Sequence, residues 1–371
     1  MRFTCNQQVL AKAMNTVSKA VSNRTTLPIL KGILIQATAD NKLIMTASDF
    51  DISIKKEIEA NVEEEGSAVV ISRLFGDIIR KLPNEEITIY KDEESSVIIK
   101  TDFSEFKLIS LPVDEFPNVG EKEEESENFL IDSNIFRDMV RKTAFAASID
   151  ESKGVLTGIL TEISERDIKM VSLDGFRLAL VKENMKSSKE RKFIISAKVM
   201  NEISKIISED DDEKEINVSL GAKKALFSIG KTEIILRIME GEYIKYRDII
   251  PSENSTKVTA GKEILLDSIE RASLLAKEGK NNLIKISIVN DLMKITSRSE
   301  EGNVKEEIII EKTGNDIEIG FNSKFVIDVL KARDDEKISM NFKTGVSPCV
   351  VKPAEGDAYE YLILPVRIPV M

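Results

Sequence analysis

"LIMTASDFDISIKKEI", residues 43–58, alternates apolar and polar side chains on both sides of a short polar turn. Alternation with a period of two is typical of half-buried strands, so this stretch predicts a β-hairpin. The same pattern recurs in "IKMVSLDGFRLALVKEN" at 168–184 and "LMKITSRSEEGNVKEEI" at 292–308. The three stretches begin about 125 residues apart, which indicates an internal repeat.

Three further sets of segments keep this spacing. Amphipathic helices open the units at 6–21, 132–147 and 261–276. A short apolar strand, a polar cap and a helix follow at 69–83, 193–207 and 318–333, with Ser72, Ser196 and Asn322 as the predicted caps. Apolar strands close the units at 105–119, 232–251 and 360–371, so the apolar C-terminal tail is predicted to be the last strand of the third repeat.

The repeat predicts three domains of one kind. A charged stretch at 120–128 and a Pro/Ser/Asn stretch at 251–256 are the predicted linkers. The domains are therefore expected at 1–122, 128–250 and 254–371. Each has two helices packed on antiparallel sheets, so the fold class is α+β.

The composition excludes several classes of active site. The 371 residues include no histidine, which removes the usual general base, the Ser-His-Asp arrangement and most zinc sites. Cys5 and Cys349 are the only cysteines and are expected to be buried thiols. The first residues lack the apolar core of a signal peptide, so we expect a cytoplasmic protein.

The charge is distributed unevenly between the predicted elements. The six helical stretches carry 17 basic and nine acidic residues, a net of +8, whereas the whole chain has −11 and the remainder therefore −19. Solvated helix faces often carry Lys and Arg, but six basic helices in an acidic chain favour a surface that faces a polyanion. The helices lack an aromatic stripe for stacking bases, so a duplex backbone is the better partner.

Several pieces, in this order and spacing, resemble the β subunit of bacterial DNA polymerase III, the sliding clamp family. They are "MRFTCNQQVL" at 1–10, "NRTTLPILKGILI" at 23–35, "FKLISLPVDEFPNV" at 106–119, "SLDGFRLAL" at 172–180, "YRDIIP" at 246–251, "EIGFNSKFVIDVLKA" at 318–332 and "YLILPVRI" at 361–368. The match covers essentially the whole chain.

The resemblance implies a head-to-tail homodimer that closes into a ring around double-stranded DNA. Helices line the hole in this family, and the ring tethers the replicative polymerase, the clamp loader and other DNA-processing proteins. Helices are roughly 10 Å wide, so six would leave a hole of about 10 Å and twelve nearly 30 Å. Since B-DNA is roughly 20 Å across, two chains are needed. The resemblance implies no cofactor, no metal and no catalytic residue.

The residues that match the family's DNA-contacting positions are basic. They are Arg24, Arg73, Arg80, Arg137, Lys153 and Lys198. Lys153 lies in "DESKGV", where the family has an aromatic loop, and is expected to contact phosphate in its place.

The resemblance also implies one apolar pocket per chain, between the second and third domains. Partners insert a short extended peptide with a glutamine and two or more large apolar side chains. The matching residues are Leu156, Leu173, Gly175, Phe176, Arg177, Leu178, Ile244, Ile249, Val346, Pro348, Leu362, Leu364, Pro365, Val366 and Arg367. Leu173 replaces a common Thr and Ile244 a common Pro, which makes the pocket more apolar. Arg367 is expected at the rim, and "PVM" at 369–371 extends past the usual end.

The dimer contact in this family joins the first domain of one chain to the third of the other. The matching residues are Phe106, Lys107 and Leu108 on one side, and Leu274, Leu275, Glu300 and Glu301 on the other. Glu105 stands where a basic residue is common, so the basic side of this contact is thin.

Two other interpretations remain open at the level of sequence. An enzyme would have to use carboxylates such as Asp49, Asp51, Asp174 or the acidic run at 208–215, and no phosphate-binding or metal-ligand motif accompanies them. A monomeric acidic scaffold built from the same repeat would have a solution mass near 41.5 kDa.

Overall fold

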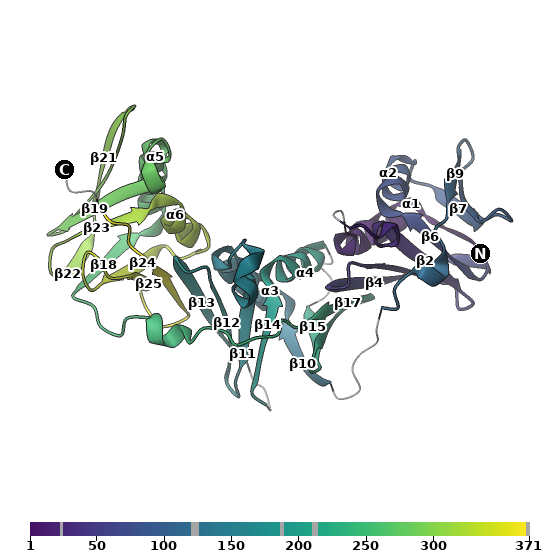
Figure 1. The fold of residues 1–371 in the computed structure, drawn as a ribbon, viewed down its shortest axis with the longest axis horizontal. Coiled ribbons are helices and arrows are strands. Elements are labelled where there is room, and N and C mark those ends of the chain that lie inside the picture. The colour runs from purple at the N-terminus through teal and green to yellow at the C-terminus, as the bar shows by residue number, and fades with distance from the viewer. Residues whose placement is uncertain (23–24, 120–125, 186–188, 210–213, 369–371) are drawn as a thin grey trace. The chain divides into compact units, whose positions relative to one another are not determined.

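The computed structural model describes residues 1–22, 25–119, 126–185, 189–209 and 214–368. The chain divides into two compact units, which are coloured along the sequence in Figure 1. The first comprises Met1–Asn134 and Glu202–Ile238, and the second Ile135–Asn201 and Met239–Met371. The division falls within two helices, α3 (Ser133–Thr143) and α4 (Ala197–Glu209).

The first unit contains two antiparallel sheets. The eight-stranded sheet has the order β10 (Glu127–Asp132), β15 (Glu215–Leu220), β16 (Lys224–Ile229), β17 (Thr232–Arg237), β4 (Ile52–Glu59), β3 (Lys42–Ser48), β2 (Gly32–Thr38) and β6 (Gly66–Ile71). The five-stranded sheet has the order β5 (Asn61–Glu64), β1 (Arg2–Asn6), β7 (Glu86–Lys91), β8 (Ser96–Lys100) and β9 (Glu105–Ile109).

The predicted hairpin at 43–58 is confirmed as β3 and β4, with Ser48 opposite Ser53 beside the turn. The other edge of β4 pairs with β17, where Ile54 lies opposite Ile234. This sheet therefore runs across the boundary predicted between the first two domains. Helices α1 (Gln7–Val17) and α2 (Ser72–Lys81) contact each other, and α1 packs on β3 and β4.

The second unit also contains two antiparallel sheets. The nine-stranded sheet has the order β14 (Arg191–Ser196), β11 (Gly158–Ile163), β12 (Asp167–Leu173), β13 (Arg177–Asn184), β26 (Tyr359–Ile363), β25 (Cys349–Pro353), β24 (Lys337–Phe342), β18 (Thr256–Gly261) and β22 (Glu311–Gly314). The four-stranded sheet has the order β21 (Gly302–Ile309), β20 (Leu292–Ser299), β19 (Leu283–Val289) and β23 (Ile317–Asn322).

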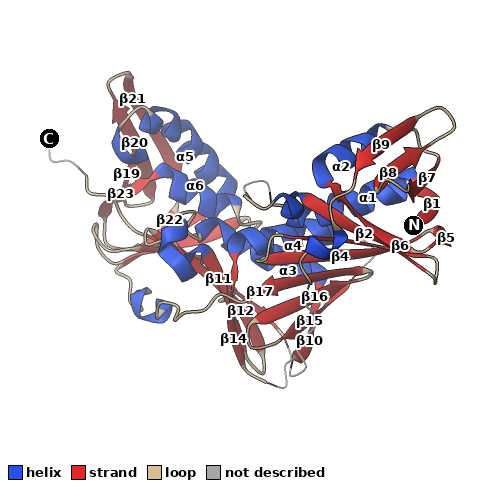
Figure 2. Cartoon of the chain, turned by 45° about the vertical axis from the view of Figure 1, so that its right-hand side comes forward, coloured by secondary structure: helices blue, strands red, loops and turns tan. Residues whose placement is uncertain are grey.

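The other two predicted hairpins are confirmed as β12–β13 and β20–β21. In β19 every second residue is buried, so Ile284, Ile286 and Ile288 form one apolar face. Helix α5 (Lys262–Lys277) contacts β19, β20 and β21 and lies beside α6 (Ser323–Lys331), as Figure 2 shows. Full burial of an isoleucine contributes about 1.5–3 kcal/mol, so this face anchors α5 on the sheet.

The six predicted helices are present, and their first turns differ in how they are capped. The Asn322 side chain accepts a hydrogen bond from the Lys324 N–H (3.0 Å), so the predicted cap of α6 is confirmed. The predicted cap at Ser72 is wrong. Ser72 is the first helical residue, buried, and Ile71 precedes it without a side-chain cap. Because α2 begins one residue earlier than predicted, the capping position falls on Ile71, whose side chain has no hydrogen-bond acceptor.

Short 3-10 helices connect the main elements. They are η1 (Ser18–Ala20), η2 (Pro28–Lys31), η3 (Val113–Glu115), η4 (Ala144–Ala146), η5 (Glu151–Thr157), η6 (Tyr246–Ile249) and η7 (Lys280–Asn282).

The C-terminal tail is only in part the predicted strand. β26 ends at Ile363, and residues 364–368 have no regular secondary structure. They run beside β23 instead, where the Val366 N–H donates to the Gly320 carbonyl (2.8 Å). A Cβ atom at Gly320 would lie 2.6 Å from the Val366 oxygen, so glycine permits this close approach. The extension at 369–371 lies outside the described residues.

Both cysteines are buried free thiols, as predicted. Burial, reinforced by Glu86, raises the pKa of Cys5 to about 12, so its thiol stays protonated. None of the helices in the described ranges is long and apolar enough to span a membrane.

Candidate functional site

An apolar cluster lies where β13 pairs with β26, in the second unit. Leu178 stands opposite Leu362 in this pairing, and Leu173 stands opposite Leu178 across the β12–β13 hairpin. All three are at most 4% exposed. The remaining members of the cluster are buried Leu160, Val171, Ile194, Tyr243 and Tyr246, with half-buried Val155, Leu156, Leu180, Met239, Ile250 and Leu364 packed against them.

The structure thus brings together five residues of the predicted pocket, and sequence reasoning missed the other nine members of the cluster. The five are Leu156, Leu173, Leu178, Leu362 and Leu364. Leu173, Leu178 and Leu362 are buried, so in a peptide site they would form the base and not the walls. Tyr243 and Tyr246 belong to the same segment as the predicted residues Ile244 and Ile249. The two tyrosines are three residues apart, and this spacing was the sequence signal that could have predicted their burial in the cluster.

Exposed apolar residues lie near members of this cluster in the sequence. Ile244 and Ile249, at 45% and 43% exposure, flank the buried Tyr246. Phe176, 60% exposed, follows Gly175 in the β12–β13 turn, and Gly175 has a φ of +95° that favours glycine. Exposed apolar side chains above a buried apolar base are the composition that an inserted peptide side chain requires.

The remaining predicted pocket residues lie in the C-terminal tail and in the segment before β25. Leu364 is hydrogen-bonded through its N–H to the Phe176 carbonyl (2.9 Å), which ties the tail to the turn. Pro365 and Val366 are half-buried, and Arg367 is exposed. Pro348 directly precedes Cys349, which pairs with Ile363, whereas Val346 is 83% exposed.

Tyr246 is fixed by a polar network at the edge of the cluster. Its hydroxyl donates to the Glu162 carboxylate (2.6 Å) and accepts from Arg247 Nε (3.3 Å). Burial and the neighbouring carboxylate raise the pKa of Tyr246 to about 12, so the phenol remains a donor near neutral pH. This bond holds η6, which carries Ile249, against β11.

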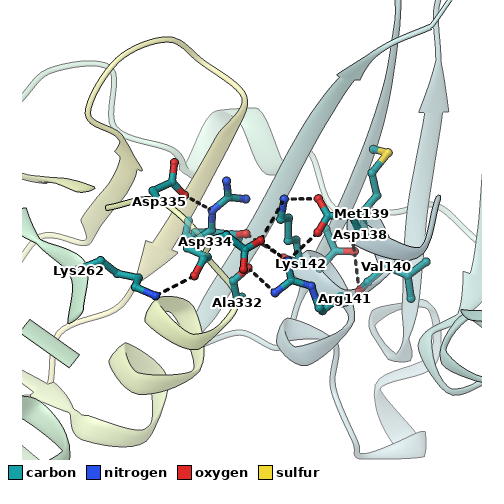
Figure 3. Close-up of polar contacts among 12 residues, drawn as sticks. Asp138, Met139, Val140, Arg141, Lys142, Lys262, Ala332, Asp334 and Asp335 are labelled. Carbon is teal, nitrogen blue, oxygen red and sulfur yellow. Dashed lines mark hydrogen bonds and ion pairs between the residues drawn. The ribbon is translucent and has the colours of Figure 1, made fainter. Parts of the chain in front are cut away.

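A second group of charged side chains lies between α3 and the segment after α6 (Figure 3). Arg141 donates to Asp138 (2.7 Å), to Asp334 (2.5 Å) and to the Ala332 carbonyl (3.4 Å), and Lys142 is paired with Asp138. Partial burial would raise the pKa of Asp138, but the bonds from Lys142 and Arg141 outweigh it and lower that pKa. The carboxylate is therefore charged at neutral pH.

The predicted DNA-contacting residues lie on both units. On the first unit, Arg73 is exposed on α2, and Arg80 is bound by Asp77 (2.5 Å) and by Asn15 of α1 (3.2 Å). A groove between these helices is lined by Gln7, Gln8, Ala11, Lys12, Asn15 and Arg80. All of these except Ala11 carry hydrogen-bond donors.

On the second unit, Lys153 is exposed in η5 and Lys198 is exposed on α4, whereas Arg137 of α3 is half-buried. Arg24 lies outside the described residues. The DNA-contacting role of all six residues stays a prediction.

The predicted dimer residues lie on or near two strands, β9 and β21, that are outermost in the sheets of the described residues. β9 is the outer strand of the five-stranded sheet, and it carries Phe106 (36% exposed) and Ile109 (83%). β21 is an outer strand of the four-stranded sheet and carries Ile309 (87%). Leu274 of the adjacent α5 is 63% exposed. An unpaired edge with exposed apolar side chains favours pairing with another chain.

The charged residues of these edges are partly engaged within the chain. Lys107 is paired with Glu94 (2.7 Å) and Asp92 (3.0 Å), which raise its pKa. Leu108 and Leu275 are half-buried, and Glu300 and Glu301 are exposed in the β20–β21 turn.

Comparison with known proteins covers the chain in three consecutive segments. Residues 1–120, 130–245 and 247–367 match the models of the N-terminal, central and C-terminal domains of the DNA polymerase III beta subunit. The beta sliding clamp of Staphylococcus epidermidis is 35% identical over 378 residues, which cover 99% of each chain.

Solved structures of such proteins share the fold over the full length. The DNA polymerase sliding clamp of Bacillus subtilis covers 100% of both chains with 31% identity and a TM-score of 0.95. A sliding clamp of Pseudomonas aeruginosa bound to griselimycin covers 99% of this chain and 100% of its own, with 26% identity and a TM-score of 0.93. The chain therefore belongs to the bacterial DNA polymerase III beta subunit family and has the DNA sliding clamp function of that family.

Proposed function

We propose that two copies of this chain close head to tail into a ring around duplex DNA and tether DNA-processing proteins to it. The ring confers processivity without catalysis of its own and works in the cytoplasm. Its partners are the replicative polymerase, the clamp loader and other proteins that carry a short clamp-binding peptide.

The observation that carries this proposal is the pair of free sheet edges. β9 belongs to the predicted first domain and β21 to the third, and each presents exposed apolar side chains, Ile109 and Ile309. Two different edges on one chain fit a heterologous contact, which closes into a ring when the rotation between copies permits it.

The apolar cluster under the β12–β13 turn supports a peptide-binding role. Leu173, Leu178 and Leu362 provide a dry base, and the exposed Ile244 and Ile249 provide walls. A pocket of this kind captures large apolar side chains and fixes their direction with few hydrogen bonds.

The solution mass tests the dimer directly. Sedimentation equilibrium is expected to give twice the 41.5 kDa of one chain. A mass that stays at 41.5 kDa at micromolar concentration would support the monomeric scaffold and remove the ring.

Replacing Arg24 and Arg73 together with alanine is expected to weaken DNA association equally for all duplex sequences. Each lost phosphate contact also lowers the slope of log affinity against log salt by about one. Because the ring holds two copies of the double variant, four contacts are lost and the slope should fall by about four. Fluorescence anisotropy with two duplexes of unrelated sequence, over a range of salt, measures both quantities.

The matched control replaces Lys224 and Lys257, which are exposed on strands β16 and β18. It removes the same charge and should leave the salt slope unchanged. A loss that depends on duplex sequence would contradict non-specific binding, and an equal loss in the control would mean that only net charge matters.

A further inference from the structure

The Arg177 side chain is held inside the protein at the edge of the pocket. It is 9% exposed, although its neighbour Phe176 is 60% exposed. Its Nε donates to Asp174 (3.1 Å), and its two Nη atoms donate to Asp328 (2.5 Å) and to the Phe145 carbonyl (2.6 Å). Every nitrogen of the guanidinium is therefore bound to an acceptor of the chain itself.

Aromatic rings enclose the same guanidinium. It lies over the rings of Phe325 and Phe145, with 4.8 Å and 5.3 Å from its central carbon to the ring centres. Phe325 also stacks on Phe176, with ring centres 6.0 Å apart and an angle of 23° between the planes. Phe325 and Asp328 are three residues apart on α6, so one face of this helix holds both Phe176 and Arg177.

We propose that Asp328 is a positioning residue of the peptide pocket. It holds Arg177, and through Arg177 and Phe325 it sets the place of the β12–β13 turn and of the Phe176 ring at the rim. This inference rests on the proposed function, because it assigns the turn to peptide binding. Arg177 then acts on the peptide through the position of Phe176 and not by donating a hydrogen bond to it.

Backbone hydrogen bonds connect the held Arg177 to the β12–β13 turn and to the C-terminal tail. The Asp174 carboxylate accepts from the N–H groups of Phe176 (2.8 Å) and Arg177 (3.0 Å), which closes the turn. The Phe176 carbonyl in turn accepts from Leu364 of the tail. If Asp328 loses its charge, the nearly buried guanidinium keeps only Asp174 as a counter-ion, and the Nη atom that Asp328 held lacks a charged acceptor.

A second ion pair of the chain serves as the control for the Arg177–Asp328 ion pair. Arg141 and Asp334 form another ion pair between the predicted second and third domains, also at 2.5 Å, but neither residue contacts the β12–β13 turn in the interactions of Figure 3. Asp334→Asn therefore removes a comparable carboxylate charge from the same unit without freeing Arg177.

The test measures binding of a fluorescein-labelled peptide that has one glutamine followed by two leucines, by anisotropy, with the full-length chain. Asp328→Asn is expected to weaken binding about tenfold, which corresponds to about 1.4 kcal/mol. Asp334→Asn is expected to change it by less than about twofold. The double variant Arg177→Gln, Asp328→Asn should bind no more weakly than Arg177→Gln alone, because both changes break one interaction.

The outcomes separate this inference from the proposed function. If the unsubstituted chain does not bind the peptide, the peptide-binding part of the proposed function fails. If it binds and Asp328→Asn binds equally well, or if Asp334→Asn loses as much, the positioning role is wrong. Should Asp328→Asn fail to fold, as judged by its thermal transition, Asp328→Glu takes its place. It keeps the charge but moves it by one methylene, so intermediate affinity supports the role and unchanged affinity overturns it.

Discussion

Replacing Leu274 with glutamate is expected to convert the dimer into monomers. Leu274 is 63% exposed on α5, beside the free edge of β21, so the monomer tolerates a charge there. In the proposed ring the same position is buried against β9 of the other copy, where an unpaired carboxylate is costly. A central interface residue of this kind contributes about 2 kcal/mol or more.

The head-to-tail geometry doubles this effect. Both interfaces of the ring form in a single association step, so two substituted contacts cost about 4 kcal/mol together and raise the dissociation constant roughly a thousandfold. Sedimentation velocity across a concentration series measures the shift.

Ile264→Glu is the control for Leu274→Glu. Ile264 has the same 63% exposure on the same helix, but it lies ten residues earlier, about 15 Å along the helix axis and rotated by about 80°. It should leave the dimer intact. A dimer that survives Leu274→Glu unchanged would place the interface elsewhere.

Replacing Ile249 with aspartate is expected to abolish partner-peptide binding while leaving the fold intact. Ile249 is 43% exposed at the rim, next to buried Tyr246, so its substitution removes little core packing. An inserted apolar side chain would have to desolvate the new carboxylate without offering it a hydrogen bond. We expect a loss of about 2–3 kcal/mol, or roughly 30- to 150-fold in affinity.

The matching control is Leu292→Asp. Leu292 is 41% exposed at the start of β20, away from the β13–β26 pairing that forms the pocket base. The peptide affinity of Leu292→Asp should equal that of the unsubstituted chain. Leu292→Asp and Ile249→Asp should both keep the thermal transition of the unsubstituted chain. Equal peptide binding by Ile249→Asp would remove this face from the site.

Sequence patterns predicted an element best where the element is amphipathic and its pattern depends only on neighbouring residues. The hairpin at 43–58 and its two repeats were found because their alternation depends only on which face of a sheet is buried. The cap at Ser72 was predicted wrongly because α2 begins one residue earlier than its polar residues indicate, which places Ser72 inside the helix. The end of β26 was missed because apolar tail residues suit either a strand or an edge contact.

The candidate pocket residues also differ in how far apart in the sequence their contact partners lie. Leu173 and Leu178 stand on either side of their turn, and a sequence can pair them. Phe325 could not be found in this way, because Phe176 and Phe325 are far apart in the sequence and only the fold brings their rings together. Likewise, nothing in the sequence around Lys107 shows that Glu94 already binds it.

The turns of the first two repeats share a backbone geometry but differ in the residues beside them. The turn at Asp49 is built like the turn at Asp174: each carboxylate accepts from the backbone N–H three residues later, at 2.9 Å and 3.0 Å. The flanking pair differs. In the first repeat it is Ser48 and Ser53, whose hydroxyls are hydrogen-bonded to each other (2.7 Å), where the second repeat has two leucines. The first turn therefore lacks an apolar base.

Topological retention on DNA tests the central claim most directly. The protein is placed on a nicked circular plasmid with a clamp-loading extract, washed at high salt and then exposed to an enzyme that cuts the circle once. A ring that encloses the duplex resists salt on the circle and slides off only after the cut, because its hold is topological and not electrostatic. If high salt removes the protein equally from circular and linear DNA, the chain does not encircle DNA and the proposed ring is wrong.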